Sequence, residues 1–342
     1  MNNISKRKQD HVDLCVNHNM NHKSKTTGLE CYEFIHNALP EINYEDISTA
    51  SFFLNKEIAA PLFISSMTGG FKGAISINQQ LAEIASTLKI PLGIGSLRIA
   101  LHDMSVHDSF TTIKHIVGDT IPLFGNIGAA EIAQKSNHAP ILSILEKCNA
   151  DAIAIHLNPL QELLQPEGNP QFKGVLHGIE SFIKLYEKPV IIKEVGAGIS
   201  MNVASKLLDI GVSAIDVAGA GGTSWAGVEL SRNSDTSSES FLWDWGIPTS
   251  ECIQMIAPFK NTHAFELYAS GGIQTAFDIA MSIALGADSV GMAGSIIKSL
   301  INDGNQATLV MIENLIINVK RIMFLTGSHN IEHLKLATIK KK

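Results

Sequence analysis

The sequence contains little cysteine, no long apolar run and no excess of basic residues. Four cysteines occur in 342 residues, and none stands in a CxxC pair, so neither a disulfide framework nor a zinc site is indicated. No run reaches the roughly eighteen apolar residues of a membrane span. The basic triplet at residues 6–8 precedes no apolar stretch typical of a secretory signal. We therefore expect a cytoplasmic protein with reduced thiols.

The charge and hydrophobicity of the chain narrow the class of ligand. A formal net charge of -7 argues against general nucleic-acid binding, which needs a basic face to neutralise phosphates. A small phosphorylated ligand stays compatible, because a local cluster can be basic on an acidic protein. Hydrophobic residues make up 45% and charged residues 17%, which permits a large core and disfavours global disorder.

Short apolar runs recur along the chain, each bounded by turn residues and followed by a helical pattern. They lack polar/apolar alternation, as expected for strands buried on both faces of a parallel sheet. Eight such runs are present, at residues 61–66, 91–95, 121–125, 151–156, 189–193, 213–217, 265–269 and 288–292. Eight β/α units predict a single-domain α/β protein, a (β/α)8 TIM barrel over residues 1–342, with an open doubly wound sheet as the alternative.

The segments between these runs have helical periodicity. Residues 75–88 place apolar side chains at helical spacing. Ser200 is a plausible N-cap for a helix over 201–210 that ends at Gly211, and another helix is expected over 276–285. These segments are predicted to be the crossover helices of the barrel.

Two regions fall outside the repeat. Residues 1–60 form a mostly polar N-terminal extension, which we expect to pack over one end of the barrel. Residues 218–247 make a long connection after strand six, and loops of this length are commonly functional lids. The serine-rich centre of this connection, residues 231–240, has too little apolar surface to bury a core and is expected to be mobile. We therefore predict an active-site lid loop.

Polar residues and glycines follow directly after the predicted strands, on the face where barrel enzymes build their sites. They include Ser66, Met67, Thr68, Ser96, Arg98, Asn126, His156, Lys193, Thr223, Gly271, Gly272, Ala293 and Gly294. The late glycines lead into helices, whose N-termini favour an anion. They are consistent either with tight βα turns or, taken together, with a phosphate site to which Thr223 could add a hydroxyl donor.

Lys193 ends a predicted buried strand, where a lysine is rare unless it is paired. One interpretation is an ion pair with Glu194, although neighbours on a strand point to opposite faces. The other is a cation that faces the electron-rich edge of a flavin ring and stabilises negative charge on its reduced form.

His156, Asn158, Gln161 and Glu162 gather an imidazole, two amides and a carboxylate at one strand end. Glu162 with Glu167 could suggest a metal pair, but one carboxylate completed by ligand phosphates and water suits Mg²⁺ better. Composition alone supports a metal ligand and a surface acid equally. The basic segment at residues 6–11 is typical of a solvated tail, and its alternative role is a clamp that closes over an anionic substrate with Arg98.

Through these blocks the sequence resembles the type 2 isopentenyl-diphosphate isomerases over nearly the whole chain. The matching blocks are RKQDH at 7–11, SMTGG at 66–70, GSLR at 95–98, NIGA at 126–129, HLN at 156–158, QE and QPEG within 161–168, KEVG at 193–196, DVAGAGGTSW at 216–225, WGIPT at 245–249 and ASGG at 269–272. SMTGG, HLN and KEVG in this order are highly specific, whereas the glycine loops are shared with other FMN barrels.

The resemblance implies an enzyme that interconverts isopentenyl and dimethylallyl diphosphate, with FMN and Mg²⁺ bound and NADPH reducing the flavin without net redox change. It implies FMN contacts from Ser66, Met67, Thr68, Ser96, Asn126, Lys193, Thr223, Gly271, Gly272, Ala293 and Gly294. It implies substrate contacts from Arg7, Lys8, His11, Ser96, Arg98 and Gln161, and a metal ligand in Glu162. It also suggests a homo-oligomer, a tetramer or octamer.

Two residues depart from the family pattern. Leu97 stands where the family usually has Gln, and Gln274 stands where it often has Arg. Neither change removes a charged diphosphate anchor, but Leu97 could change contacts in the substrate pocket.

The reaction moves a proton between C2 and C4 of an allylic unit, a carbon acid too weak for an ordinary side-chain base. We hypothesise that reduced FMN, held by Lys193, provides the proton and stabilises the cation, while His156, Asn158 and Gln161 order the geometry. Trp225 is a candidate shield and Glu229 a candidate proton relay, with lid packing as the alternative for each.

Three other classes compete with this interpretation. An FMN-dependent 2-hydroxy-acid oxidase or dehydrogenase needs carboxylate-binding arginines late in the barrel, whereas Arg232 lies in the predicted lid and Arg321 beyond strand eight. An inosinate-dehydrogenase-like enzyme needs a catalytic cysteine in a loop over the site, and none of the four lies in a glycine-rich βα loop. A non-enzymatic flavin- or phosphate-binding barrel would be a yellow protein without turnover.

Overall fold

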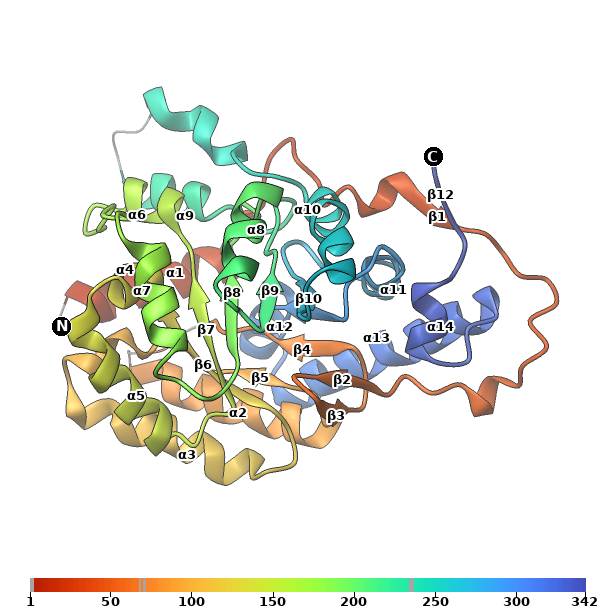
Figure 1. Cartoon of the computed structure of the whole chain (residues 1–342), viewed down its shortest axis with the longest axis horizontal. Coiled ribbons are helices and arrows are strands. Elements are labelled where there is room, and N and C mark those ends of the chain that lie inside the picture. The colour runs from red at the N-terminus through yellow and green to blue at the C-terminus, as the bar shows by residue number, and fades with distance from the viewer. Residues whose placement is uncertain (1–2, 68, 70–71, 234–236) are drawn as a thin grey trace.

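Eight parallel strands close into a barrel in the computed structural model, which describes residues 3–67, 69, 72–233 and 237–342 (Figure 1). The strands are β4 (Leu62–Ile64), β5 (Leu92–Gly93), β6 (Leu123–Gly128), β7 (Ala152–His156), β8 (Val190–Lys193), β9 (Ala214–Asp216), β10 (Glu266–Ala269) and β11 (Ser289–Met292). The ring closes where β11 pairs with β4, from Val290↔Leu62 to Met292↔Ile64. Each predicted run overlaps one of these strands, so the barrel is confirmed and the open sheet is wrong.

Helices follow the strands and cover the outside of the barrel (Figure 1). They are α2 (Lys72–Leu88), α3 (His107–Val117), α5 (His138–Lys147), α7 (Val175–Ile183), α8 (Met201–Asp209), α10 (Thr249–Ile256), α11 (Ala276–Ala284), α12 (Gly294–Asn302), α13 (Asn305–Thr326) and α14 (Ile331–Lys335), with short α4 (Ala129–Ile132) and α6 (Pro159–Leu164). Ser200 caps α8 as predicted, because its side chain accepts a hydrogen bond from the Val203 N–H.

Aromatic side chains fill the barrel at the end where its strands begin. Phe53 stacks on Tyr268, with ring centroids 4.6 Å apart, and meets Phe63 edge-on at 5.3 Å. Phe53 comes from outside the barrel, from the hairpin formed by β2 (Ser51–Phe53) and β3 (Lys56–Ile58). This plug closes one end of the barrel and leaves the other end for polar side chains.

The N-terminal extension contacts both ends of the barrel, which corrects the expectation that it covers one. Helix α1 (Asn3–Asn17) packs against α9 (Trp225–Arg232) and α12 beside the carboxyl ends of the strands, while the β2–β3 hairpin plugs the opposite end. Between them, β1 (Tyr32–Phe34) pairs antiparallel with β12 (Ile339–Lys341).

The long connection after β9 is more ordered than its composition suggests. It contains α9 (Trp225–Arg232) and a 3-10 helix over Ser237–Asp244. Ser224 caps α9 by accepting from the Gly227 N–H, and Trp243 anchors the second helix by donating from Nε1 to the Asn21 carbonyl at 2.9 Å. The described residues of the predicted mobile centre are therefore helical, its mobility stays a prediction, and residues 234–236 lie outside the described part of the chain.

The cysteines and helices agree with the expectations drawn from composition. All four cysteines are free, and Cys148 and Cys252 are buried. Burial raises the pKa of the Cys148 thiol to about 11 and that of Cys252 to about 12, so both stay protonated near neutral pH. No helix in the described ranges is long and apolar enough to cross a membrane.

Candidate active site

Three ionisable residues stand side by side where β7, β8 and β9 end. His156 is the register partner of Lys193, and Lys193 is the register partner of Asp216. Partners in a parallel sheet point to the same face, which here is the barrel interior. The strand ends therefore bring an imidazole, an ammonium and a carboxylate together, as predicted for the first two.

Lys193 does not form the ion pair with the Glu194 carboxylate that the sequence left open. Its Nζ donates to the Glu194 backbone carbonyl at 2.7 Å, while the Glu194 side chain accepts from backbone N–H groups of the following loop, including Gly196 at 2.7 Å. Burial lowers the pKa of Lys193, and the nearby Asp216 opposes that shift. Lys193 is thus a buried cation whose charge depends on its carboxylate neighbours.

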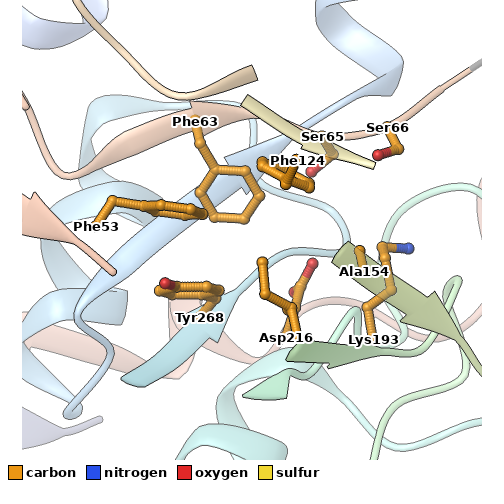
Figure 2. Close-up of a pocket in the computed structure, with 10 residues that line it drawn as sticks. Phe53, Phe63, Ser65, Ser66, Phe124, Ala154, Lys193, Asp216 and Tyr268 are labelled. Atoms are coloured by element: carbon orange, nitrogen blue, oxygen red, sulfur yellow. The ribbon is translucent and has the colours of Figure 1, made fainter. Parts of the chain in front are cut away.

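A small cavity separates these charges from the aromatic plug (Figure 2). Lys193, Asp216, Ser65 and Ser66 line its polar side, and Figure 2 shows the rings of the plug on the other. Among the described residues, the Ser65 and Ser66 hydroxyls are buried without a hydrogen-bond partner. Unpartnered buried donors of this kind are available to a ligand.

His156 is held neutral. Its Nδ1 lies 3.0 Å from the Asn126 Oδ1, so the ring donates to the amide oxygen of the neighbouring strand. Burial lowers the pKa of His156 to about 3, and the positive charges of Lys193, Lys8 and Arg98 add to the shift. A neutral, oriented imidazole suits a supporting role and excludes His156 as a cationic acid near pH 7.

Helix α6 carries an amide–carboxylate cluster. The Asn158 Nδ2 donates to Gln161 Oε1 at 3.1 Å and to Glu162 Oε1 at 3.2 Å. Glu162 Oε2 accepts from the Asn169 N–H at 2.6 Å, and Glu162 Oε1 lies 3.9 Å from Arg98 NH1. Glu162 is therefore a buried, oriented carboxylate and not a surface acid.

Glu229 is fully buried and links α9 to α1 and α6. Its carboxylate lies 2.8 Å from His11 Nε2 and 2.6 Å from Arg232 NH1, and it accepts from Gln161 Nε2 at 3.3 Å. Burial alone would raise the pKa of Glu229, but His11 and Arg232 together lower it. Glu229 is consequently ionised, and the Trp225 ring packs edge-on against His11 at 5.2 Å.

Glu167 contacts an arginine: its Oε1 lies 3.5 Å from Arg232 NH2, whereas Arg232 NH1 contacts Glu229. The described residues contain no group of three His, Cys, Asp or Glu side chains able to hold a metal ion. Any metal here would take one protein carboxylate and complete its shell elsewhere.

Helix α1 brings two cations to the site, so the solvated-tail interpretation is wrong for Arg7 and Lys8. Arg7 is 8% exposed, and its Nε, like the Lys8 Nζ, has no hydrogen-bond partner among the described residues. Burial lowers the pKa of Lys8 to about 7, with further lowering by Arg7 and Arg98. Three clustered cations with free buried donors suit a polyanion.

The glycine loops after β9, β10 and β11 converge as a cradle. A Cβ on Gly222 would collide with the Gly272 nitrogen, and one on Gly271 with the Gly219 backbone. The Thr223 hydroxyl would lie 3.4 Å from a Cβ placed on Gly294, the first residue of α12. Backbones this close exclude side chains from the cradle, and the N-terminus of α12 beside them would favour an anion.

The remaining predicted residues lie around these groups. Ser96 caps the 3-10 helix Leu97–Leu101 by accepting from the Arg98 N–H, Met67 packs partly buried against the core, and Ala293 precedes α12. Thr68 lies outside the described residues. Leu97 is fully buried in the hydrophobic core, where a Cβ on Gly125 would lie 3.2 Å from it. Its effect on the substrate pocket stays a prediction.

Sequence reasoning missed three residues that shape the site. Asp216 pairs in register with Lys193, Glu131 holds Arg98 Nε at 2.8 Å, and Arg232 neutralises Glu229. The acid at the end of an otherwise apolar run was a detectable signal for Asp216, because the next strand of a barrel must neighbour Lys193. Glu131 and Arg232 lie on short helices whose contacts no local pattern reveals.

Solved flavoenzyme structures share the barrel. The chain superposes on a mandelate oxidase with a TM-score of 0.69 (16% identity, 99% of this chain and 98% of the other), and on a lactate oxidase from Pediococcus acidilactici with 0.71 (13%, 100% and 95%). A flavocytochrome b2 gives 0.72 (15%, 97% and 83%). At such low identity these likenesses show the fold alone.

The barrel, the cradle and a family match define the class as an FMN-dependent (β/α)8-barrel enzyme, because the FMN-dependent dehydrogenase model matches residues 167–341. An isopentenyl-diphosphate delta-isomerase from Chlorobium luteolum is 45% identical over 98% of this chain and 95% of its own length. Those of Chlorobium phaeovibrioides (44%, 98% and 96%) and Nostoc sp. (41%, 96% and 93%) are similar. The chain therefore belongs to the isopentenyl-diphosphate delta-isomerase family.

Proposed function

We propose that this chain interconverts isopentenyl and dimethylallyl diphosphate in isoprenoid biosynthesis, by a 1,3-allylic proton shift that depends on reduced FMN. The observation that carries the proposal is the cluster of Arg7, Lys8 and Arg98, which has unpartnered buried donors beside the strand-end charges. This arrangement offers a diphosphate three cations within reach of Lys193, in a member of the isomerase family.

The residues present fit FMN. The buried Ser66 hydroxyl lacks a partner among the described residues, and the glycine loops, where no side chain fits, would present backbone N–H groups to a phosphate. The proposed FMN contacts are Ser66, Met67, Thr68, Ser96, Asn126, Lys193, Thr223, Gly271, Gly272, Ala293 and Gly294. Lys193 would lie against the flavin ring, where a buried cation stabilises negative charge on the reduced form.

Glu162 is the proposed Mg²⁺ ligand. Its carboxylate is buried and already oriented by Asn158 and Asn169, and Mg²⁺ commonly takes one or two carboxylates and completes its shell with substrate phosphates and water. The nearby Arg98 would then share the diphosphate with the metal. NADPH is the proposed reductant of the flavin.

The chain's own residues would bind and orient the substrate. Arg7, Lys8, His11, Ser96 and Arg98 would hold the diphosphate, and Gln161 would lie along the hydrocarbon part. When bound and reduced, FMN would supply the proton and stabilise positive charge on the carbon chain. Neutral His156 and Asn158 would fix the geometry around that step. Glu229, ionised and joined to Gln161, would relay a proton, while Trp225 shields the site.

A 2-hydroxy-acid oxidase or dehydrogenase is the second candidate, supported by the shared fold and by the FMN-dependent dehydrogenase model. The terminal nitrogens of Arg232 already contact Glu229 and Glu167, and Arg321 is exposed on α13. Neither arginine therefore presents both terminal nitrogens, buried and free, to a substrate carboxylate. We further propose a cytoplasmic homo-oligomer, a tetramer or octamer.

The test begins with the absorption spectrum of the purified protein, which should show oxidised flavin. Isomerase activity is then measured anaerobically with FMN, Mg²⁺ and NADPH, and again with the flavin kept fully oxidised. We expect turnover only after reduction. Undiminished isomerisation with oxidised flavin would overturn the reduced-flavin mechanism, and oxidation of a 2-hydroxy acid without isomerisation would favour the second candidate.

A further inference from the structure

Residues 20–27, here named the strap, run beside the loop that enters the glycine cradle. The His22 N–H donates to the Gly222 carbonyl at 2.9 Å, and the Ser224 N–H donates to the Met20 carbonyl at 2.8 Å. These bonds form an antiparallel bridge in which Asn21 faces Thr223. The strap is therefore hydrogen-bonded to the cradle through backbone groups that no side-chain substitution removes.

The strap also packs as a second layer behind the cradle. His22 is 9% exposed, and its Nδ1 lies 3.0 Å from the Gly222 carbonyl and 3.4 Å from the Gly221 nitrogen. Side chains on Gly221 or Gly272 would collide with Thr27. Both glycines have positive φ, +123° and +80°, so this backbone conformation is readily available only to glycine. Strap and cradle thus restrain each other.

The strap and the cradle each continue into an element of the diphosphate site. The strap follows α1, which carries Arg7 and Lys8, and the cradle loop leads into α9. The two helices meet again where His11 contacts the Glu229 carboxylate at 2.8 Å. Two short connections therefore join the cradle to the cation cluster.

The 3-10 helix Ser237–Asp244 also contacts the strap. Asp244 accepts from the Lys23 N–H and from the Ser24 hydroxyl, each at 2.7 Å. Because this contact touches neither the cradle nor the cations, it offers an independent way to loosen the strap.

We propose that FMN phosphate in the cradle and diphosphate at the cation cluster strengthen each other's binding through the strap. The proposal rests on the FMN and diphosphate sites of the proposed function. An anion in the cradle orders the glycine loop, so α1 loses less conformational freedom when it closes on a second anion. Linkage requires that each ligand raise the affinity of the other by the same factor.

The test titrates FMN into apoprotein by flavin fluorescence, with and without saturating inorganic diphosphate, and then repeats the titration in reverse. We expect diphosphate to tighten FMN binding by about fivefold or more, the lower end of typical coupling. Equal affinities, or weaker FMN binding, would overturn the coupling. If wild type binds FMN and isomerises substrate without coupling, the proposed function survives alone, whereas failure to bind FMN refutes both.

Two variants separate coupling from general damage. His22→Ala removes the side-chain contacts with Gly221 and Gly222 but keeps the backbone bonds, so it should lower the coupling factor below that of wild type. His18→Ala, at an exposed histidine just after α1, should leave the coupling factor unchanged. If His22→Ala weakens the binding of both ligands but leaves the coupling factor unchanged, the strap has only a structural role and the proposal fails. Asp244→Asn replaces His22→Ala if the latter does not fold, and it should lower the coupling factor with folding intact by circular dichroism.

Discussion

Lys8 shows how burial sets the pH range of a single residue. Its pKa is lowered to about 7, so the ligand-free side chain loses its proton as the pH rises through neutrality. Since the protonated form attracts a diphosphate, affinity is present below pH 7 and lost above it. We expect the Kd for inorganic diphosphate to rise about tenfold between pH 6 and 8, as for one coupled proton. Isothermal titration at several pH values measures this dependence.

Lys8→Arg provides the fixed-charge control for that measurement. An arginine stays protonated throughout this range, so the variant should retain only the pH dependence that diphosphate itself contributes. A slope identical to that of wild type would show that Lys8 does not couple to the ligand.

For single residues, the sequence predicted the position along a strand better than the burial and contacts of the side chain. His156 and Lys193 end their strands as expected, because apolar runs locate strand ends well. The same composition could not show that Arg7 is buried, since a basic segment is polar whether it is solvated or docked. The burial of Leu97 in the core was hidden for a related reason: its side-chain direction depends on the 3-10 turn that Ser96 caps.

Among the elements, the cradle owes its shape to crowding as well as to backbone conformation. Gly271 has φ +92° and abuts the Gly219 backbone, whereas Gly174 has a similar φ of +87° and nothing within 4 Å. Gly174→Ala should cost about 1 kcal/mol for its left-handed conformation. Gly271→Ala should cost several times more and weaken FMN binding, because the backbone cannot yield. Urea unfolding and FMN titration of both variants test this, and equal costs would refute the crowding argument.

The barrel elements were predictable because each combines a buried apolar run with a following helix. The three-residue strands β1, β2, β3 and β12 were not, since runs this short carry no readable period. The two helices of the serine-rich connection were not predictable from its composition either. They are held by the Trp243 contact with Asn21 and by the cap at Ser224, which local composition does not reveal.

For the molecule as a whole, the aromatic plug should hold the barrel together without touching its chemistry. Phe53 is fully buried against Tyr268 and Phe63, whereas its neighbour Phe52 is 62% exposed. Phe53→Ala should lower the free energy of unfolding by about 3–5 kcal/mol. Phe52→Ala should change it by less than about 0.5 kcal/mol. Chemical denaturation measures both.

FMN affinity of the folded Phe53→Ala protein provides the second readout. We expect it to match wild type, because the plug and the cradle lie at opposite ends of the barrel. A parallel loss of affinity and stability would mean that the two ends are not independent.

The pairing of β11 with β4 also determines when the barrel can close during synthesis of the polypeptide. At roughly 5–20 residues per second, the ribosome produces Val290 on the order of 10–50 s after its partner Leu62. Throughout that interval β4 presents one unpaired edge to solvent. Such an edge can pair with another nascent chain, so molecular chaperones that shield it until translation ends should matter more to the yield of this protein than the stability of the finished barrel.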